Sequence, residues 1–391
     1  MDLSDERLIR LCCDLVRCRT VTGEEKPAAD VAAAAMREFG YDEVRVDRLG
    51  NVVGIVRGGP GPTVLLDGHL DTVPVANPDA WSRDPFCGDV VDGAVYGRGS
   101  ADMKSAVAAM IVAGARVKAA GRPAGNVVVS ASVCEELFEG KAFAEVVEAV
   151  QPDVVVIGEA TELRLNRGGR GRAEVVVETA GVPAHSSTPH MGVNAVYQMM
   201  AVLPRLRAVP QPTDPFLGPA ILELTDIISA PYPGASVLPV SCRVTFDRRL
   251  LVGEDEAAVL DPLRAMLDER AREDPRFKGT VAVAHDEVCC YTGATLGGTK
   301  FAHAWAFPED HPMVRRALAG LAATGQQPQV GHYRFCTNGS HSGGVARIPT
   351  LGYGPGREDQ AHVTDEALAV DQITRACAGY AALIRTLTSP S

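Results

Sequence analysis

The sequence lacks an excess of basic residues, a long apolar run and an apolar signal core. Its 38 basic and 49 acidic side chains give a formal charge of −11, which disfavours nucleic acid and anionic membranes as partners because both select basic surfaces. No run of about 18 apolar residues, the length that a bilayer requires, is present. The N-terminus is charged rather than apolar. We therefore expect no nucleic-acid partner and no membrane partner.

Several common motifs are also absent. The ten cysteines are irregularly placed and none forms a CxxC pair, which argues against a zinc finger and predicts reduced, mostly buried thiols in a cytoplasmic protein. Residues 97–102 lack the third glycine of a dinucleotide loop, and Asp102 would repel phosphate. The loop around His341 has histidine where a GxSxG nucleophile elbow has serine. Neither a dinucleotide site nor a serine nucleophile is expected.

A short apolar strand leads into Gly68-His69-Leu70-Asp71, and the rest of the chain supplies partners for this stretch. On extended backbone His69 and Asp71 point the same way. An imidazole can bind a metal ion while a carboxylate fixes its orientation. A core histidine beside a turn-forming aspartate fits the stretch equally well, so the partners decide between the two interpretations.

Two more predicted strands end in carboxylates. Residues 126–133 lead into Glu135 and Glu136, and residues 154–157 lead into Gly158-Glu159. Adjacent carboxylates on extended backbone face opposite ways, so Glu135 and Glu136 are expected to differ in role. A solvated acidic pair at a helix start is the structural alternative. In an open α/β sheet, ligands bind at the carboxyl ends of the strands.

Asp102 stands just before a predicted helix, residues 104–120, that is almost wholly apolar or small. Such a helix is buried, and we place it against a sheet. The simplest role for Asp102 is an N-cap. Its position between the three strand ends makes a metal ligand the alternative.

The order of elements predicts an α/β domain interrupted by a smaller one. The 391 residues, 46% of them hydrophobic, are enough for two domains. Residues 173–288 follow a βαββαβ order, typical of an α+β domain with helices on one face, and residues 289–391 return to the first pattern. Other helices are expected near residues 8–16, 25–39, 191–206, 254–273, 311–323 and 365–387.

Two loops in the last part of the chain add candidates. The glycine- and hydroxyl-rich loop at residues 337–344 can present backbone donors to an anion, so Asn338, Ser340 and Gly343 are candidate substrate-binding residues. His362 precedes the last predicted helix. Taken alone it would be an exposed histidine near a helix start.

Together these pieces resemble the M20 family of metallopeptidases and amidohydrolases, the group of acetylornithine deacetylase, succinyl-diaminopimelate desuccinylase and carboxypeptidase G2. The resemblance covers essentially the whole chain, insertion included. Each motif is weak alone, but their order and spacing are specific. The matching motifs are residues 68–74, residues 97–104, Glu135-Glu136, Gly158-Glu159, the motif around His185 and Ala361-His362.

The resemblance implies a mixed-sheet catalytic domain, residues 1–172 and 289–391, that holds two divalent metal ions per subunit. Zinc is expected, with cobalt or manganese as alternatives. Glu135 would be the general base toward a metal-activated water, and Asp71 would hold His69 from behind. The implied ligands are Asp102 bridging both metals, His69 and Glu159 on one metal, and Glu136 and His362 on the other.

The insertion, residues 173–288, resembles the family's lid and dimerisation domain. There His185 is similar to a histidine that donates to the oxyanion and that comes from the neighbouring subunit in dimeric relatives, which implies a homodimer through this domain. Arg249 resembles a carboxylate-binding arginine, with Arg248 as the competing register and surface charge as the alternative for both. Ser236-Val237-Leu238-Pro239 departs from the Asn-Val-Ile-Pro of many relatives, which leaves the acyl group and side chain of the substrate undecided.

The resemblance therefore implies a cytoplasmic hydrolase that cleaves the amide bond of a small N-acyl amino acid or a short peptide. A deacylase is favoured, and a dipeptidase or aminopeptidase on the same scaffold is the alternative. The alternative from another class is a non-catalytic metal- or ligand-binding homologue. The complete set of implied ligands, with the base, argues against it.

Overall fold

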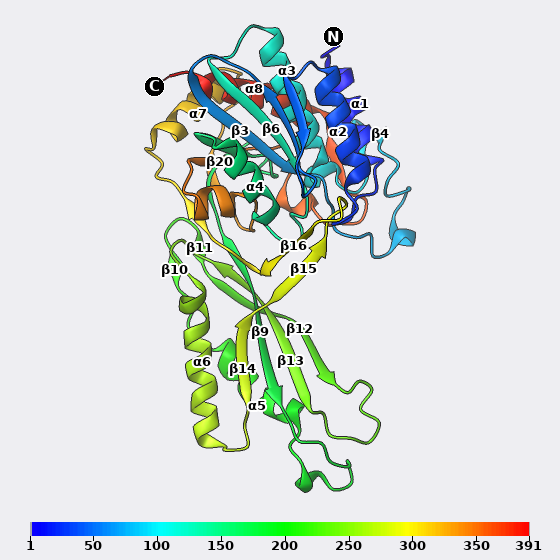
Figure 1. Cartoon of the computed structure of the whole chain (residues 1–391), viewed down its shortest axis with the longest axis vertical. Helices are drawn as coiled ribbons and strands as arrows, with labels where there is room; N and C mark the ends of the chain where they lie inside the picture. Colours follow the sequence, from blue (N-terminus) through cyan, green and yellow to red (C-terminus); the bar gives the residue numbers. More distant parts are fainter. Residues whose placement is uncertain (1, 391) are drawn as a thin grey trace. The chain divides into compact units, whose positions relative to one another are not determined.

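The computed structural model describes residues 2–390 and consists of two compact units (Figure 1). The first runs to Gly169 and takes in Glu287–Leu296 and the chain from Trp305 onward; the second comprises Arg170–Asp286 and Gly297–Ala304. The ten cysteines are free thiols and most are buried, as predicted. Among the described residues, none of the helices is long and apolar enough to span a membrane.

A nine-stranded mixed sheet lies at the centre of the first unit, in the order β1-β2-β6-β3-β7-β20-β8-β18, with β19 beside β8. Its central strands are apolar on both faces because helices cover both. The strands are β1 (Glu43–Val46), β2 (Val52–Val56), β3 (Gly61–His69), β6 (Gly125–Ser132), β7 (Val154–Ile157), β8 (Leu165–Gly169), β18 (Trp305–Ala306), β19 (Val330–Tyr333) and β20 (Thr350–Gly352).

Helices cover both faces of this sheet (Figure 1). Leu66 of β3 belongs to the core formed with α1, α2, α3, α7 and α8, whereas Leu65 packs with α4. The helix α3, whose side chains are mostly small, is buried and packs against α8, α1 and the sheet. The helix α4 was not predicted, although Phe143 and Val147 show its apolar spacing. The helices are α1 (Asp5–Val16), α2 (Lys26–Glu38), α3 (Ser105–Ala119), α4 (Lys141–Val150), α7 (Pro312–Ala322) and α8 (Val370–Thr388).

The register of the central strands brings their carboxyl ends to one edge of the sheet. Strand β3 is parallel to both neighbours, with His69 opposite Ser132 of β6 and Asp67 opposite Ile157 of β7. The loops that leave β6 and β7 therefore begin beside His69. This confirms the prediction that three strands deliver polar side chains to the same edge.

A small antiparallel sheet joins two distant loops of the first unit. Strand β21 (Ala367–Ala369) pairs with β5 (Ala94–Tyr96), which in turn pairs with β4 (Asp89–Val91) through the Asp92-Gly93 turn. This pairing places the chain that follows His362 beside the chain that precedes Asp102. Further short pairs are β10 (Thr213–Asp214) with β11 (Gly218–Pro219) and β15 (His285–Cys289) with β16 (Thr295–Thr299).

The second unit is a five-stranded antiparallel sheet in the order β12-β13-β9-β14, with β17 beside β9. Its βαββαβ order is as predicted, and α5 and α6 pack on one face. Strand β12 lies at one edge of this sheet. The elements are β9 (Gly171–Ala180), α5 (Ala195–Arg207), β12 (Ile221–Ala230), β13 (Ser241–Leu250), α6 (Glu256–Glu273), β14 (Gly279–Val283) and β17 (Phe301–Ala302).

Candidate metal centre

The centre of the candidate site is the carboxylate of Asp102, which faces two histidines. Its Oδ1 lies 3.0 Å from Nε2 of His69, and its Oδ2 lies 3.1 Å from Nε2 of His362. Asp102 sits in the distorted turn Ser100–Lys104 before α3, and its side chain does not cap that helix. The N-cap alternative is therefore wrong, because both carboxylate oxygens face imidazole nitrogens instead.

A glutamate joins each histidine. Oε1 of Glu159 lies 3.3 Å from Nε2 of His69, and Oε1 of Glu136 lies 3.2 Å from Nε2 of His362. Each imidazole nitrogen thus faces one oxygen of Asp102 and one oxygen of a glutamate. Such mixed imidazole and carboxylate donors are typical ligands of zinc and related divalent ions. All five predicted ligands come together, and their chemistry fits a pair of such ions.

Glu135 lies slightly farther out. Its Oε2 is 3.9 Å from Nε2 of His69, and the residue is only 6% exposed. By proximity alone, His69, Glu135 and Glu159 also form a possible metal-binding group. Glu135 and Glu136 contact different histidines. The expected reason, extended backbone, does not apply, because β6 ends at Ser132 and both glutamates lie in the loop that follows.

Burial and close charges shift the pKa values of this cluster. Burial alone would raise the pKa of Asp102, but hydrogen bonds from His362 and His69 lower it below its usual value. Hydrogen bonds to Asp102 and Glu136 raise the pKa of His362 to about 10. Burial raises the pKa of Glu159 to about 7 and that of Glu135 well above its usual range.

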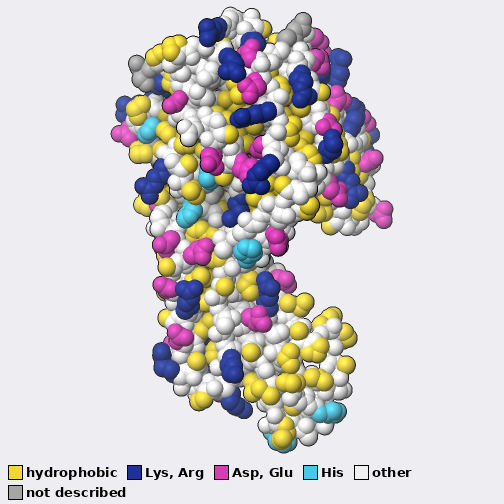
Figure 2. Space-filling view, in the orientation of Figure 1, with side chains coloured by type: hydrophobic (Ala, Val, Ile, Leu, Met, Phe, Trp, Pro, Cys, Tyr) yellow, Lys and Arg dark blue, Asp and Glu magenta, His cyan; other side chains and the backbone are white. Residues whose placement is uncertain are grey.

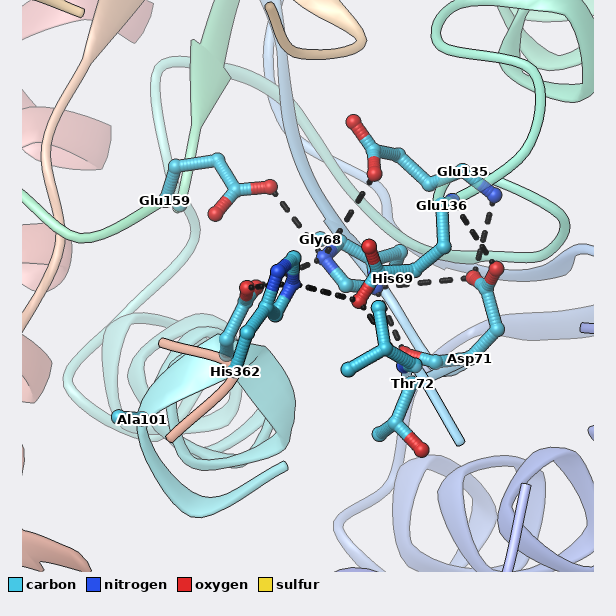
Figure 3. Close-up of polar contacts among 12 residues, drawn as sticks. Gly68, His69, Asp71, Thr72, Ala101, Glu135, Glu136, Glu159 and His362 are labelled. Atoms are coloured by element: carbon cyan, nitrogen blue, oxygen red, sulfur yellow. Dashed lines mark hydrogen bonds and ion pairs between the residues drawn. The ribbon is translucent and has the colours of Figure 1, made fainter. Parts of the chain in front are cut away.

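Asp71 orients the site by two routes. Nδ1 of His69 hydrogen-bonds to the backbone oxygen of Asp71 at 2.9 Å, whereas the Asp71 carboxylate is 3.6 Å from that nitrogen. The carboxylate oxygens accept instead from the backbone N–H groups of Glu135 and Glu136, each at 3.1 Å (Figure 3). Asp71 thus connects His69 with both glutamates, a second contact that the sequence did not indicate.

Glu366 is a site residue that the sequence analysis missed. It is 1% exposed, and its Oε1 accepts from the backbone N–H groups of Ala101 at 2.8 Å and Asp102 at 3.1 Å. Its other oxygen pairs with Arg98. Glu366 lies four residues after His362 and bonds to the turn that carries Asp102, so it connects the two loops that meet at the candidate site. Only its short distance from His362 in the sequence could have pointed to it.

Two segments that carry candidate ligands contain residues in the left-handed backbone region. His362 has φ of 62° and Cys134, next to Glu135, has φ of 59°. Non-glycine residues adopt this region at a cost, and they do so mainly where the surroundings over-determine the backbone, often at functional sites. Both positions adjoin or belong to the metal-competent cluster.

The predicted substrate-binding loop is largely buried. Asn338 donates from Nδ2 to Asp67 at 2.8 Å and to Ser132 at 3.0 Å, and its Oδ1 accepts from the N–H of Gly140 at 2.8 Å. Ser340 is 2% exposed. A Cβ at Gly343 would lie 3.0 Å from the Trp305 side chain. A substrate-binding role for Asn338, Ser340 and Gly343 stays a prediction.

The predicted residues of the second unit have partners of their own. His185 is exposed, and its Nδ1 lies 2.7 Å from the hydroxyl of Ser187. Arg249 is partly buried, and its Nε lies 2.7 Å from Asp247. Arg248 is 3% exposed, on the helix-covered face of β13, and pairs with Glu254. Of the two arginines, Arg249 has the more accessible guanidinium; its role and that of His185 stay predictions.

Comparisons with known proteins identify the family and the fold of this chain. The model of peptidase family M20/M25/M40 matches residues 65–386. The uncharacterised protein YgeY of Escherichia coli K12 is 31% identical over 384 residues, covering 96% of this chain and 93% of its own. A succinyl-diaminopimelate desuccinylase of Phenylobacterium zucineum is 31% identical over 401 residues, covering 96% and 97%. The metallo-carboxypeptidase Sso-CP2 of Sulfolobus solfataricus shares the fold, with a TM-score of 0.79 at 14% identity over 99% and 100% of the two chains.

Proposed function

Because this chain belongs to peptidase family M20/M25/M40, we propose that it is a metal-dependent hydrolase that cleaves the amide bond of an N-acyl amino acid. The observation that carries this proposal is the Asp102 carboxylate. Its two oxygens face different imidazole nitrogens, at 3.0 and 3.1 Å, and each imidazole has its own glutamate. This donor set suits two neighbouring divalent ions.

We assign the shared position between two metal ions to Asp102. The donor types suit Zn²⁺, and Co²⁺ or Mn²⁺ can use the same donors. Bound ions would polarise the amide carbonyl and lower the pKa of the attacking water. The remaining ligands are His69 and Glu159 for one ion, and Glu136 and His362 for the other.

We assign the general base to Glu135. It is buried and lies farther from His69 than Glu159 does, at 3.9 against 3.3 Å. Burial raises its pKa, which favours a carboxylate that can take up and hold a proton during the reaction. Glu135 would accept a proton from the attacking water and deliver it to the leaving nitrogen.

We further propose a homodimer formed through the second unit. Its edge strand β12 exposes Ile227 and Ile228, which are 52% and 57% accessible, and the loop that follows β12 exposes Tyr232 at 85%. Figure 2 shows apolar side chains gathered on this unit. An unpaired edge with apolar side chains can bind a second copy of itself. The family resemblance then suggests that His185 of the partner subunit donates to the oxyanion.

A substrate screen tests the proposed activity. The purified protein is assayed with added Zn²⁺ or Co²⁺ against N-acetyl-, N-succinyl- and N-carbamoyl-amino acids and against dipeptides. A desuccinylase among the relatives favours acyl substrates, whereas the carboxypeptidase that shares the fold motivates the dipeptides. We expect faster hydrolysis of acyl substrates. Turnover of dipeptides alone would replace the deacylase by a peptidase, and no turnover by a metal-loaded protein would favour a non-catalytic homologue.

A further inference from the structure

The loop that carries Glu135 and Glu136 is held by side chains rather than by secondary structure. It connects β6 to α4, and four consecutive backbone N–H groups in it donate to side chains from elsewhere in the first unit. Val133 donates to Asn51 Oδ1 at 3.0 Å, Cys134 to Glu25 Oε1 at 3.1 Å, Glu135 to Asp71 Oδ1 at 3.1 Å and Glu136 to Asp71 Oδ2 at 3.1 Å.

The acceptors of these four bonds are themselves fixed in place. All three are 0% exposed. Oε1 of Glu25 also accepts from the N–H of Gly23 at 3.0 Å, and Nδ2 of Asn51 donates to the carbonyl of Ala142 at 3.0 Å. An acceptor that is anchored by a second contact resists moving with the loop. The loop is therefore held in one position relative to α2, β2 and β3.

Glu25 holds the residue at which the loop turns. Cys134 has φ of 59°, a conformation that a non-glycine residue keeps only where its surroundings impose it. The hydrogen bond from its N–H to Glu25 is such a restraint. The next residue is Glu135, so the conformation at Cys134 sets the direction in which the Glu135 side chain leaves the backbone. Resting on the role proposed above for Glu135, we propose that Glu25 is a positioning residue that aims the general base.

Two substitutions separate position from charge. Glu25→Gln keeps the length of the side chain and an acceptor oxygen but removes the charge. Glu25→Asp keeps the charge but shortens the reach to the N–H of Cys134. If Glu25 acts by position, Glu25→Asp lowers kcat on the order of 10²-fold, the scale that a displacement of about 1 Å can cause. KM and metal content stay close to wild type, and Glu25→Gln keeps most of the activity.

The matched control is Glu24→Gln, which removes the charge of the neighbouring exposed carboxylate and is expected to leave kcat unchanged. All rates are expressed per folded, metal-loaded subunit. Wild-type kcat in Glu25→Asp, or equal loss in Glu25→Gln and Glu25→Asp, would overturn the proposal. Glu135→Gln is assayed in parallel: if it retains turnover, the assignment of the base is wrong instead.

Hydrogen–deuterium exchange tests the proposal even if Glu25→Asp does not fold. In the wild-type protein the amide of Cys134 is expected to exchange slowly, because its donor bond to Glu25 is buried. Slow exchange in the wild type that is kept in Glu25→Gln, which retains an acceptor oxygen, supports the restraint. Where Glu25→Asp folds, the same amide should exchange fast in it while the rest of the first unit stays protected. Exchange of this amide in the wild type at the rate of an exposed loop would overturn it.

Discussion

The two units place their polar residues differently. In the first unit the candidate ligands are mostly buried and contact one another, with His69 1% and Glu159 4% exposed. In the second unit His185 is exposed and hydrogen-bonds to its near neighbour Ser187. The same unit exposes Ile227 and Ile228 on an edge strand. The first unit assembles its candidate site from its own residues. The second unit exposes a histidine and apolar side chains that no other described residue covers.

The difference indicates how the proposed activity is divided. Buried charges are costly unless they are paired or bind a metal. The first unit therefore has a preorganised cluster, and a change to this cluster should lower activity directly. Exposed groups gain a defined environment only when another surface covers them. The second unit should therefore matter through assembly, and perturbations of the two units should have different signatures.

Chelation should have the largest effect. Removing divalent metal leaves Asp102, Glu136 and Glu159 without the cations that their arrangement fits, and we expect activity to vanish. Adding Zn²⁺ or Co²⁺ should restore it. Activity assays on dialysed protein, with the residual metal measured by elemental analysis, check this. Full activity in protein shown to be metal-free would contradict the proposed mechanism.

Replacing the base should come next. Glu135→Gln keeps the shape of the side chain but cannot accept the proton, so kcat should fall by about 10²–10⁴-fold. Metal content should stay near wild type because the ligands are unchanged. Kinetics and elemental analysis on the same preparation check both parts. Loss of one metal per subunit would mean that Glu135 is a ligand and that the roles of Glu135 and Glu136 must be exchanged.

A smaller effect is expected in the second unit. His185→Ala should lower kcat by about 10²–10³-fold, as expected for loss of one oxyanion donor, and should leave metal content unchanged. If His185 acts across a dimer, mixing His185→Ala subunits with Glu135→Ala subunits should restore part of the activity. Subunit exchange verified by mass, with activity still flat, would rule out action on the partner's site.

Metal affinity should depend on pH. For each proton that metal binding releases, the affinity should rise about tenfold per pH unit. The pKa of His362 is raised to about 10 by Asp102 and Glu136, so its imidazole is protonated in the metal-free cluster at neutral pH. Metal must displace that proton, and affinity should therefore rise as pH increases from 6 to 8. Titrations against an indicator chelator measure this, and a constant affinity would contradict the assigned His362 ligand.

The smallest effect on the fold should come from the edge strand. Ile228 is 57% exposed, so Ile228→Asp should change the free energy of unfolding by no more than about 0.5 kcal/mol. Placed in an apolar interface, the same charge should prevent dimerisation. Light scattering and thermal unfolding of the variant check both expectations. An unchanged dimer would move the proposed interface away from β12.

Much of the fold and of the cluster could be predicted locally. Apolar strands followed by a polar residue identified His69, Glu135, Glu136 and Glu159, because a strand and its end are visible in consecutive residues. Asp102 was ambiguous, since an aspartate before a helix is usually a cap. The structure resolved it by bringing His362, which follows it by more than two hundred residues, to its second oxygen.

The sequence by itself determined the types of the metal-competent residues, the strand ends that carry them and the inserted α+β unit. Only the tertiary structure decided which buried carboxylates support them through hydrogen bonds from backbone N–H groups. Asp71 accepts from Glu135 and Glu136, Glu366 accepts from Asp102, and Glu25 accepts from Cys134. The physical reason is the sequence distance between the interacting residues. Periodicity records which side chains are apolar along one element, whereas a buried carboxylate that accepts a distant backbone N–H leaves no local pattern, because its partner is chosen when the strands and loops pack together.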